Sequence, residues 1–384
     1  MSKPRITVII PTRERCDVLE KSLRTVTAQD YDNLEIIVSD NFSGDATCEV
    51  VRAANDPRIR YLNTGKRLSM SHNWEFALSH VEDGWVSIIG DDDGLLPGCL
   101  TKISEVVRSF RVLAIRTKVC GYSWPSLTGK EFGLLRVPFG NGSEVRGTRR
   151  WLDLVLTARA NYTDLPMLYN GGFVSMAVLK EIKGKTRAIY QSCIPDVYSA
   201  VAISSSIDRY VYLAEPVAIN GASKHSTGSA QFKAEGGRDE SPAKKFQSET
   251  NIPFHDDVPL MPDGSFPVSI QAFIYESYLQ SAALRPGEDS PQHAEQLKLI
   301  LATASRRHLA AVMQWGRLFA DRHGLNFETV AGTAFRTRLL IKAKAQLKWP
   351  GPAWKEVGSR EEPIRDVYEA SLVAARICQK PRVK

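Results

Sequence analysis

Short apolar strands and amphipathic helices alternate through the first hundred residues of the chain. Strand signals fall at residues 6–10, 34–38, 58–62 and 85–89, with helix signals between them at 17–29, 46–54 and 71–81. Strands that alternate with helices of about ten residues form βαβ units, whose strands run parallel in one sheet. The sequence therefore predicts an α/β fold, an open and mostly parallel sheet flanked by helices.

Length and composition are those of an ordinary folded protein. The 384 residues are 43% hydrophobic and 24% charged, as in typical globular domains. No apolar run approaches the roughly 20 residues that cross a bilayer, and a strand follows the N-terminus at once, so we expect neither a membrane span nor a signal peptide. Six cysteines without C-x-x-C spacing favour reduced thiols in a cytoplasmic enzyme. The formal charge of +7 favours anionic partners.

Three adjacent carboxylates, Asp91, Asp92 and Asp93, follow the strand expected at 85–89. Adjacent carboxylates repel one another unless a cation lies among them. Oxygen ligands of this kind suit Mn²⁺ or Mg²⁺, which usually enter such sites with the phosphates of a substrate. Ligands of open α/β sheets also gather where the strands end. The simpler alternative is an acidic surface turn, because Asp and Gly both favour turns.

The second half of the chain has a different pattern. Helix, strand and Gly/Pro-rich signals mix up to about residue 228, and a polar stretch at 231–249 is typical of a loop. Helical periodicity then recurs at 269–283, 291–305, 307–322 and 327–349. We expect a sheet domain at 1–230, a linker or loop at 231–255, and an α-helical C-terminal extension at 256–384.

Four motifs of the first hundred residues together resemble the family 2 glycosyltransferases, whose fold is called GT-A. They lie at residues 8–13, 37–41, 71–74 and 90–98, the last being the D-x-D region. Each motif alone is weak, but their order and spacing are specific. The resemblance covers roughly residues 4–230 and leaves the helical extension outside it.

The resemblance implies an inverting glycosyltransferase that uses Mn²⁺ or Mg²⁺. Such an enzyme moves a sugar from a nucleotide-diphosphate donor, here expected to be a UDP-sugar, to a hydroxyl of a saccharide or lipid-linked saccharide acceptor. The setting that the family implies is surface polysaccharide or glycoconjugate synthesis. A catalytic domain at 1–230 would carry the whole site.

By the same resemblance, several loops hold the nucleotide. Asp40 would accept from the base edge, although Ser39 stands where the family usually has a second acidic residue, and Asp40 could equally be a turn carboxylate. Asn73 would lie near the nucleotide, or act as a helix N-cap. Lys224 would contact the diphosphate. The full set of nucleotide-binding residues is Pro11, Thr12, Arg13, Glu14, Asp40, Asn73, Asp91, Asp92 and Lys224.

Metal, catalytic and acceptor roles follow in the same way. Asp93 would ligate the metal, with His225 as a further ligand, unless that histidine is simply solvated. Asp196 would be the catalytic base, although Pro195 stands where the family usually has Glu, and an N-cap is the alternative role for Asp196. Asn170, Gly171 and Gly172 would face the acceptor, or form an ordinary turn.

Two other functions stay open. A sugar-1-phosphate nucleotidyltransferase also uses acidic residues and Mg²⁺, but the loop at residues 11–15 lacks the glycines of that class. A non-catalytic nucleotide-sugar-binding protein of the same fold is the other alternative, favoured by Pro195. The chain has neither a G-x-x-x-x-G-K-[ST] nor a G-x-G-x-x-G motif. Clustered basic and aromatic residues are missing from the sheet domain, so we expect no nucleic-acid partner.

The last predicted helix is strongly basic at its end. Residues 334–349 contain no acidic residue, and apolar side chains are interleaved with Arg336, Arg338, Lys342, Lys344 and Lys348. Such a helix can lie on an anionic membrane surface, which would make the enzyme peripheral at the inner face of the membrane. It can equally pack on the catalytic domain or form the contact of a homo-oligomer.

Overall fold

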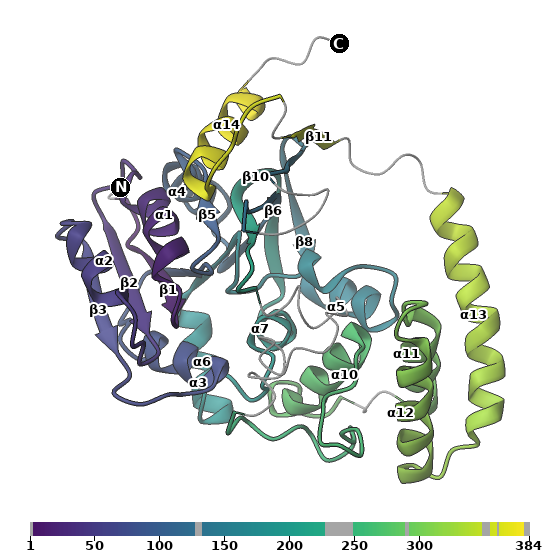
Figure 1. Cartoon of the computed structure of the whole chain (residues 1–384). Coiled ribbons are helices and arrows are strands. Elements are labelled where there is room, and N and C mark those ends of the chain that lie inside the picture. The colour runs from purple at the N-terminus through teal and green to yellow at the C-terminus, as the bar shows by residue number, and fades with distance from the viewer. Residues whose placement is uncertain are drawn as a thin grey trace.

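A mixed sheet with helices on both faces forms the centre of the molecule (Figure 1). The computed structural model describes residues 3–126, 133–226, 249–288, 292–347, 354–358 and 361–379. The strands of one half are β1 (Ile6–Thr12), β2 (Leu34–Asp40), β3 (Ile59–Asn63) and β4 (Trp85–Ile88). They pair in parallel, as the sequence predicts, and their order is β4-β1-β2-β3. Their carboxyl ends therefore meet at one edge, where Thr12 pairs with Asp40.

The other half of the sheet is mostly antiparallel. Its strands are β5 (Gly94–Leu95), β6 (Ala114–Ser123), β7 (Leu135–Pro138), β8 (Ser143–Gly147), β9 (Gly172–Ser175), β10 (Arg209–Ala222) and β11 (Trp354–Val357). The sheet continues in the order β11-β7-β6-β9-β4, because β9 pairs antiparallel with both β4 and β6. β10 runs parallel to β6 and antiparallel to β5 and β8.

Alternate residues of the parallel strands bury themselves on opposite faces of the sheet, as the strand period of two requires. Val8 and Ile10 pack with α1 (Cys16–Thr27), α2 (Thr47–Ala53) and α4 (Cys99–Phe110). Ile9 and Ile37 pack instead with α3 (Met70–Leu78), α6 (Met176–Thr186) and α7 (Pro195–Ser204). Each of these strand residues has no exposed surface. The sheet is therefore covered on both faces, and its strand ends are left to carry ligands.

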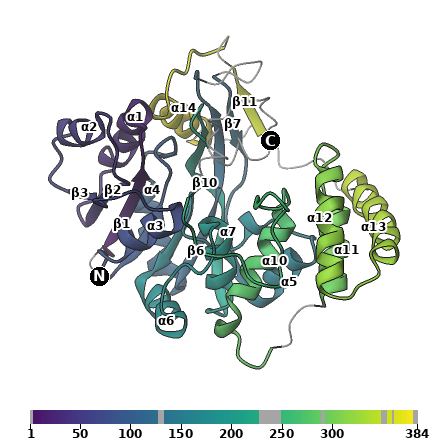
Figure 2. The ribbon, with the colours of Figure 1, turned by 60° about the horizontal axis from the view of Figure 1, so that its bottom comes forward.

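The predicted C-terminal helices are present as a bundle beside the sheet. They are α10 (Ile270–Gln280), α11 (His293–Thr303), α12 (Leu309–Arg322) and α13 (Phe327–Leu347). Phe273 and Ile274 of α10 pack with Val197 and Val201 of α7 and with α5 (Thr148–Leu156). Figures 1 and 2 both show α13 as the outermost helix, with α11 and α12 between it and the sheet.

The end of the chain returns to the sheet, which the helical pattern alone did not predict. β11 pairs antiparallel with β7 at the sheet edge. Val367 and Ala370 of α14 (Val367–Gln379) pack against Tyr122 and Val137. The expected linker at 231–255 lies largely outside the described residues, which resume at 249. Of the helices that the structure describes, none has both the length and the apolar character to cross a membrane.

Glu276 of α10 is a charged group at the junction of bundle and sheet. Its carboxylate has no exposed surface and accepts hydrogen bonds from Ser192 Oγ at 2.6 Å and His255 N at 3.3 Å. Burial raises the pKa of Glu276 to about 7 from an ordinary 4.5. The fold therefore binds this proton more tightly than the unfolded chain does.

This buried carboxylate predicts a specific pH dependence of stability. Its proton stabilises the fold fully below pH 4.5, and that contribution disappears as pH rises through 7. Glu276→Gln keeps an acceptor oxygen and cannot ionise, so we expect it to raise the free energy of unfolding at pH 8, by about 3 kcal/mol at most. At pH 5 we expect a much smaller gain. Urea unfolding at both values measures this, with exposed Glu105→Gln as control. An equal effect of Glu276→Gln at both pH values would contradict it.

Candidate functional site

The three carboxylates after β4, which we call the acidic turn (residues 91–93), are all buried and each contacts a different partner. Asp91 Oδ1 accepts from Arg15 Nη1 at 2.9 Å. Asp92 Oδ2 accepts from Ser223 Oγ and Ser226 Oγ, each at 2.6 Å. Asp93 accepts from the backbone N–H groups of Gly90 at 2.7 Å and Gly221 at 2.8 Å, and has no exposed surface. The turn is therefore held between the start of α1 and the end of β10.

The charges of the acidic turn are only partly compensated. Burial, followed by the neighbouring charge of Asp92, raises the pKa of Asp93 to about 7. Burial also raises the pKa of Asp91, against the attraction of Arg15. Burial opposes the charge of Arg15, but Asp91 and Asp92 outweigh it and raise the pKa of the guanidinium. One arginine beside three carboxylates leaves a site that favours a further cation.

The predicted nucleotide loop lies beside the acidic turn, at the ends of β1 and β2. Asp40 Oδ1 accepts from Ser43 N at 2.9 Å, and its other oxygen accepts from the Tyr61 hydroxyl and from Asn63 Nδ2. Glu14 Oε1 accepts from Gly44 N at 3.0 Å. Both carboxylates thus bind the loop after β2. The loop after β2 therefore lies against the predicted nucleotide loop at residues 11–14.

Asn73 lies inside α3 and not at its N-cap. Ser69 occupies the cap position and accepts from His72 N. Asn73 Oδ1 accepts from Ser39 Oγ at 2.7 Å, and Asn73 is 4% exposed. This hydrogen bond joins α3 to the end of β2. Ser39, which stands where the family usually has an acidic residue, therefore has a structural partner in Asn73.

Lys224 and His225 contact α1. The resemblance predicts other partners, the diphosphate for Lys224 and the metal for His225. Lys224 Nζ and His225 Nε2 lie 3.2 and 3.1 Å from Asp17 Oδ2. The backbone carbonyl of His225 accepts from Arg15. The structure thus brings their loop to the acidic turn, but the described contacts do not join His225 to Asp93. Within the described ranges, no group of three or more His, Cys, Asp or Glu side chains is arranged to hold a metal.

Asp196 lies in the first turn of α7, directly after Pro195 at the helix start. The N-cap position belongs to Ile194. Asp196 is half-buried, and its Oδ2 accepts from the Tyr162 hydroxyl at 2.9 Å. Burial raises the pKa of Asp196. A carboxylate with a raised pKa accepts a proton more readily than an ordinary one does.

Tyr169 connects Asp196 with the acidic turn. Its ring stacks on Trp74, with ring centroids 5.4 Å apart. Burial, followed by the charges of the acidic turn and of Asp196, raises the pKa of the Tyr169 hydroxyl. The Tyr169 hydroxyl is therefore close enough to Asp93 and to Asp196 for the charges of both to act on it.

Comparisons with known proteins agree with this geometry. Residues 7–145 match the family model described as "Glycosyl transferase family 2". This part of the chain is a family 2 glycosyltransferase domain. The match includes the nucleotide loop, Asp40, Asn73 and the acidic turn. It ends before residues 170–172, Asp196, Lys224 and His225, so the roles of these residues stay predictions.

Similar proteins align with about a hundred residues of this chain. The GalNAc(5)-diNAcBac-PP-undecaprenol beta-1,3-glucosyltransferase of Campylobacter jejuni is 37% identical over 105 residues, which are 27% of this chain and 34% of that protein. The succinoglycan biosynthesis protein ExoO of Rhizobium meliloti is 24% identical over 102 residues, 27% of this chain and 29% of that protein. The chain thus spans about a third of the length of these relatives.

One solved structure extends the likeness beyond the family match. The crystal structure of S. aureus TarS 1-349 in complex with UDP-GlcNAc has a TM-score of 0.50 to this chain at 13% identity. The alignment covers 90% of this chain and 93% of that chain. At this identity the likeness shows the fold alone, and the GT-A fold expected from the sequence is confirmed.

The segment that is predicted to face the acceptor has a structural role in the interior. Asn170, Gly171 and Gly172 are all buried. Arg116 donates to the carbonyls of Tyr169 and Asn170 at 3.1 and 2.6 Å, which fixes this segment. These contacts give the segment a structural role, and its role toward the acceptor stays a prediction.

Gly172 gives this structural role a test. A Cβ at position 172 would lie 1.8 Å from the carbonyl oxygen of Met167, which is backbone and cannot move aside. We expect Gly172→Ala to lower the free energy of unfolding by about 2–4 kcal/mol, measured by urea denaturation. Gly184 of α6 has no atom within 4 Å of its Cβ position and is the matched control. Gly184→Ala should be neutral or stabilising by up to about 1 kcal/mol. Wild-type stability of Gly172→Ala would contradict this structural role of Gly172.

Several contacts of the site were not predicted from the sequence. Arg15 follows the predicted nucleotide loop directly, and its position before a helix start beside an acidic cluster was a usable signal. Tyr162, Tyr169 and the serines at 223 and 226 carry no such pattern. Their partners lie far away in sequence, so only the fold reveals them.

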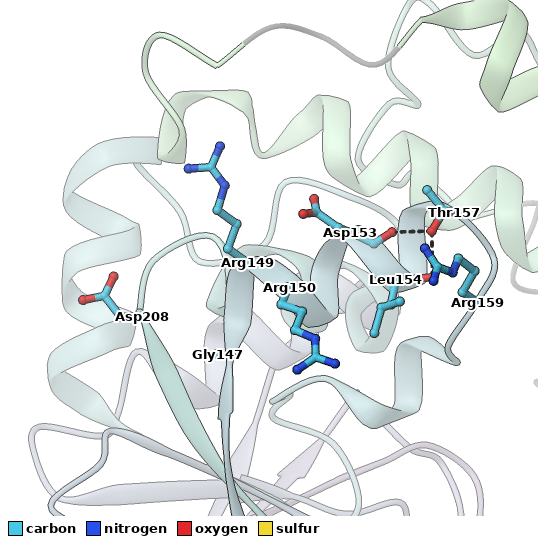
Figure 3. A pocket seen from close by; sticks show the side chains of 8 residues that line it. All are labelled: Gly147, Arg149, Arg150, Asp153, Leu154, Thr157, Arg159 and Asp208. Carbon is cyan, nitrogen blue, oxygen red and sulfur yellow. Dashed lines mark hydrogen bonds between the residues drawn. The ribbon is translucent and has the colours of Figure 1, made fainter.

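A separate cavity of about 680 Å³ lies outside the site, along α5 (Figure 3). Its lining consists of Gly147, Arg149, Arg150, Asp153, Leu154, Thr157, Arg159 and Asp208. Arg149 also forms an ion pair of 3.7 Å with Glu288. None of the residues predicted for the nucleotide, the metal, the acceptor or the base lines this cavity.

Proposed function

We propose that the chain is an inverting glycosyltransferase that moves a sugar from a UDP-sugar to a hydroxyl of a saccharide or lipid-linked saccharide, in polysaccharide or glycoconjugate synthesis. The observation that carries the proposal is the convergence of the acidic turn and Asp196 on Tyr169. The names of two similar proteins support the choice of substrates. One acts as a beta-1,3-glucosyltransferase on an undecaprenol-linked saccharide, and TarS was solved with UDP-GlcNAc.

The donor nucleotide would lie at the ends of β1, β2 and β4. Residues 11–14 and Asp40 surround the point where the parallel strands end, which is where open α/β sheets bind ligands. Asp91, held by Arg15, would contact the ribose. Lys224 would have to leave Asp17 to reach a diphosphate, and the exposed side chain of Lys224 permits such a move.

A divalent metal fits the chemistry of the acidic turn. The site offers oxygen donors, and its negative charge exceeds what Arg15 compensates. We assign the ligand role to Asp92, in place of Asp93, because both oxygens of Asp93 accept from backbone N–H groups inside the protein. When bound, Mn²⁺ or Mg²⁺ would neutralise charge on the departing nucleoside diphosphate.

Asp196 would act as general base. Its carboxylate takes the proton of the acceptor hydroxyl while that oxygen bonds to the anomeric carbon of the sugar. The bond from the anomeric carbon to the diphosphate oxygen breaks on the opposite face, and the nucleoside diphosphate leaves with the bonding electrons. Attack opposite to the leaving group inverts the configuration. Tyr162 would position Asp196 through their 2.9 Å hydrogen bond.

The base assignment predicts a loss of turnover without a loss of donor binding. Asp196→Asn keeps the shape and an acceptor oxygen for Tyr162 but cannot take a proton, so we expect a turnover lower by a factor of about 10² or more. Release of nucleoside diphosphate measures turnover, and calorimetry measures donor binding. Asp153→Asn, an exposed carboxylate on α5, is the control and should keep wild-type turnover. Wild-type turnover in Asp196→Asn would remove Asp196 from the mechanism.

The metal assignment predicts different effects for two neighbouring carboxylates. Asp92→Asn should remove most of the Mn²⁺-dependent affinity for UDP in calorimetry, with a nearly unchanged melting temperature. Asp93→Asn should lower the melting temperature, because an amide nitrogen would replace an oxygen that accepts from Gly90 or Gly221. If Asp92→Asn keeps full UDP affinity and a stable Asp93→Asn loses it, Asp93 and not Asp92 is the metal ligand.

The two alternative functions predict other results. A nucleotidyltransferase would release pyrophosphate from a nucleoside triphosphate and a sugar phosphate. A non-catalytic binding protein would bind the donor with the same metal dependence and release no nucleoside diphosphate.

A further inference from the structure

Helix α13 leaves apolar side chains in contact with solvent on one side. Its inner side packs on the bundle core, where Phe327, Val330 and Ala334 are each less than 10% exposed. On its opposite side, Phe335 is 64% exposed, Leu339 53% and Leu340 62%. With Arg336, which is also exposed, these residues form what we call the α13 outer face. Contiguous exposed apolar residues of this size usually mark an interaction surface.

The charge around the α13 outer face is of one sign. After Glu328 the sequence has no acidic residue up to position 349, but it has Arg336, Arg338, Lys342, Lys344 and Lys348. The side chains of the last three lie outside the part of the chain that the structure describes. Of these cations the structure describes Arg336 and Arg338, which lie on the same helix as the exposed Phe335, Leu339 and Leu340. The described part of this surface is therefore both apolar and positive.

We propose that the α13 outer face binds an anionic membrane surface. Phe335, Leu339 and Leu340 would enter the boundary between headgroups and acyl chains, while Arg336 and Arg338 reach anionic headgroups. The helix lies at the outside of the molecule, beyond α11 and α12, so a flat surface can reach it (Figures 1 and 2). A symmetric contact with a second copy is disfavoured, because it would bring two positive segments together.

Vesicle sedimentation of the full chain tests this surface directly. We expect binding to vesicles of phosphatidylcholine with phosphatidylglycerol, weaker binding as salt increases, and little binding to phosphatidylcholine alone. Exchanging Phe335, Leu339 and Leu340 together for Gln should lower the partition coefficient about tenfold or more. Leu372→Gln changes an exposed leucine of α14 and should bind as the wild type does.

Circular dichroism and the melting temperature should show that the triple variant is folded, since all three side chains are exposed. Equal binding to neutral and anionic vesicles, no binding by the wild type, or unchanged binding by the triple variant would overturn the proposal. A wild-type dimer that the triple variant converts to a monomer, with no vesicle binding by either, would also overturn it. None of these measurements needs sugar transfer, so their failure leaves the proposed reaction untouched.

Discussion

The burial of three adjacent carboxylates is the constraint on which the site depends. Such a cluster is stable only if each carboxylate has its own partners. Arg15 at the start of α1, the backbone of β10 at Gly221, and the serines after β10 supply them. Segments more than 200 residues apart in sequence therefore meet at the acidic turn. This explains why the strand β10 and the loop after it belong to the site as much as the first hundred residues do.

Because each buried carboxylate needs its own partners, the three aspartates of the acidic turn have different roles. Asp93 is turned inward and holds the backbone, Asp91 is neutralised by Arg15, and Asp92 contacts hydroxyl groups of a loop. Hydroxyl partners are the easiest of these to replace by a metal or a ligand, because a hydroxyl can rotate or move with its loop. Tyr169 then relates the turn to Asp196, whose burial keeps its proton affinity high.

The sequence predicted the parts of the fold that have short-range patterns. Strand alternation at residues 6–10 and 34–38 and the helical period of 307–322 were sufficient, and these elements are confirmed. Asp40 and the acidic turn were found because they follow strands. The mixed half of the sheet, β11 and the return of α14 depend on contacts between distant segments. For the same reason, the burial of Asn170 to Gly172 and the pairing of His225 with Asp17 could not be read from residue types.

A donor screen tests the central claim most directly. The full chain would be incubated with UDP-, GDP- and dTDP-sugars in the presence of Mn²⁺ or Mg²⁺, and release of nucleoside diphosphate would be measured for each. The account predicts metal-dependent release from a UDP-sugar, since water can replace the acceptor slowly. No release from any donor, together with no calorimetric binding of UDP in the presence of either metal, would contradict it.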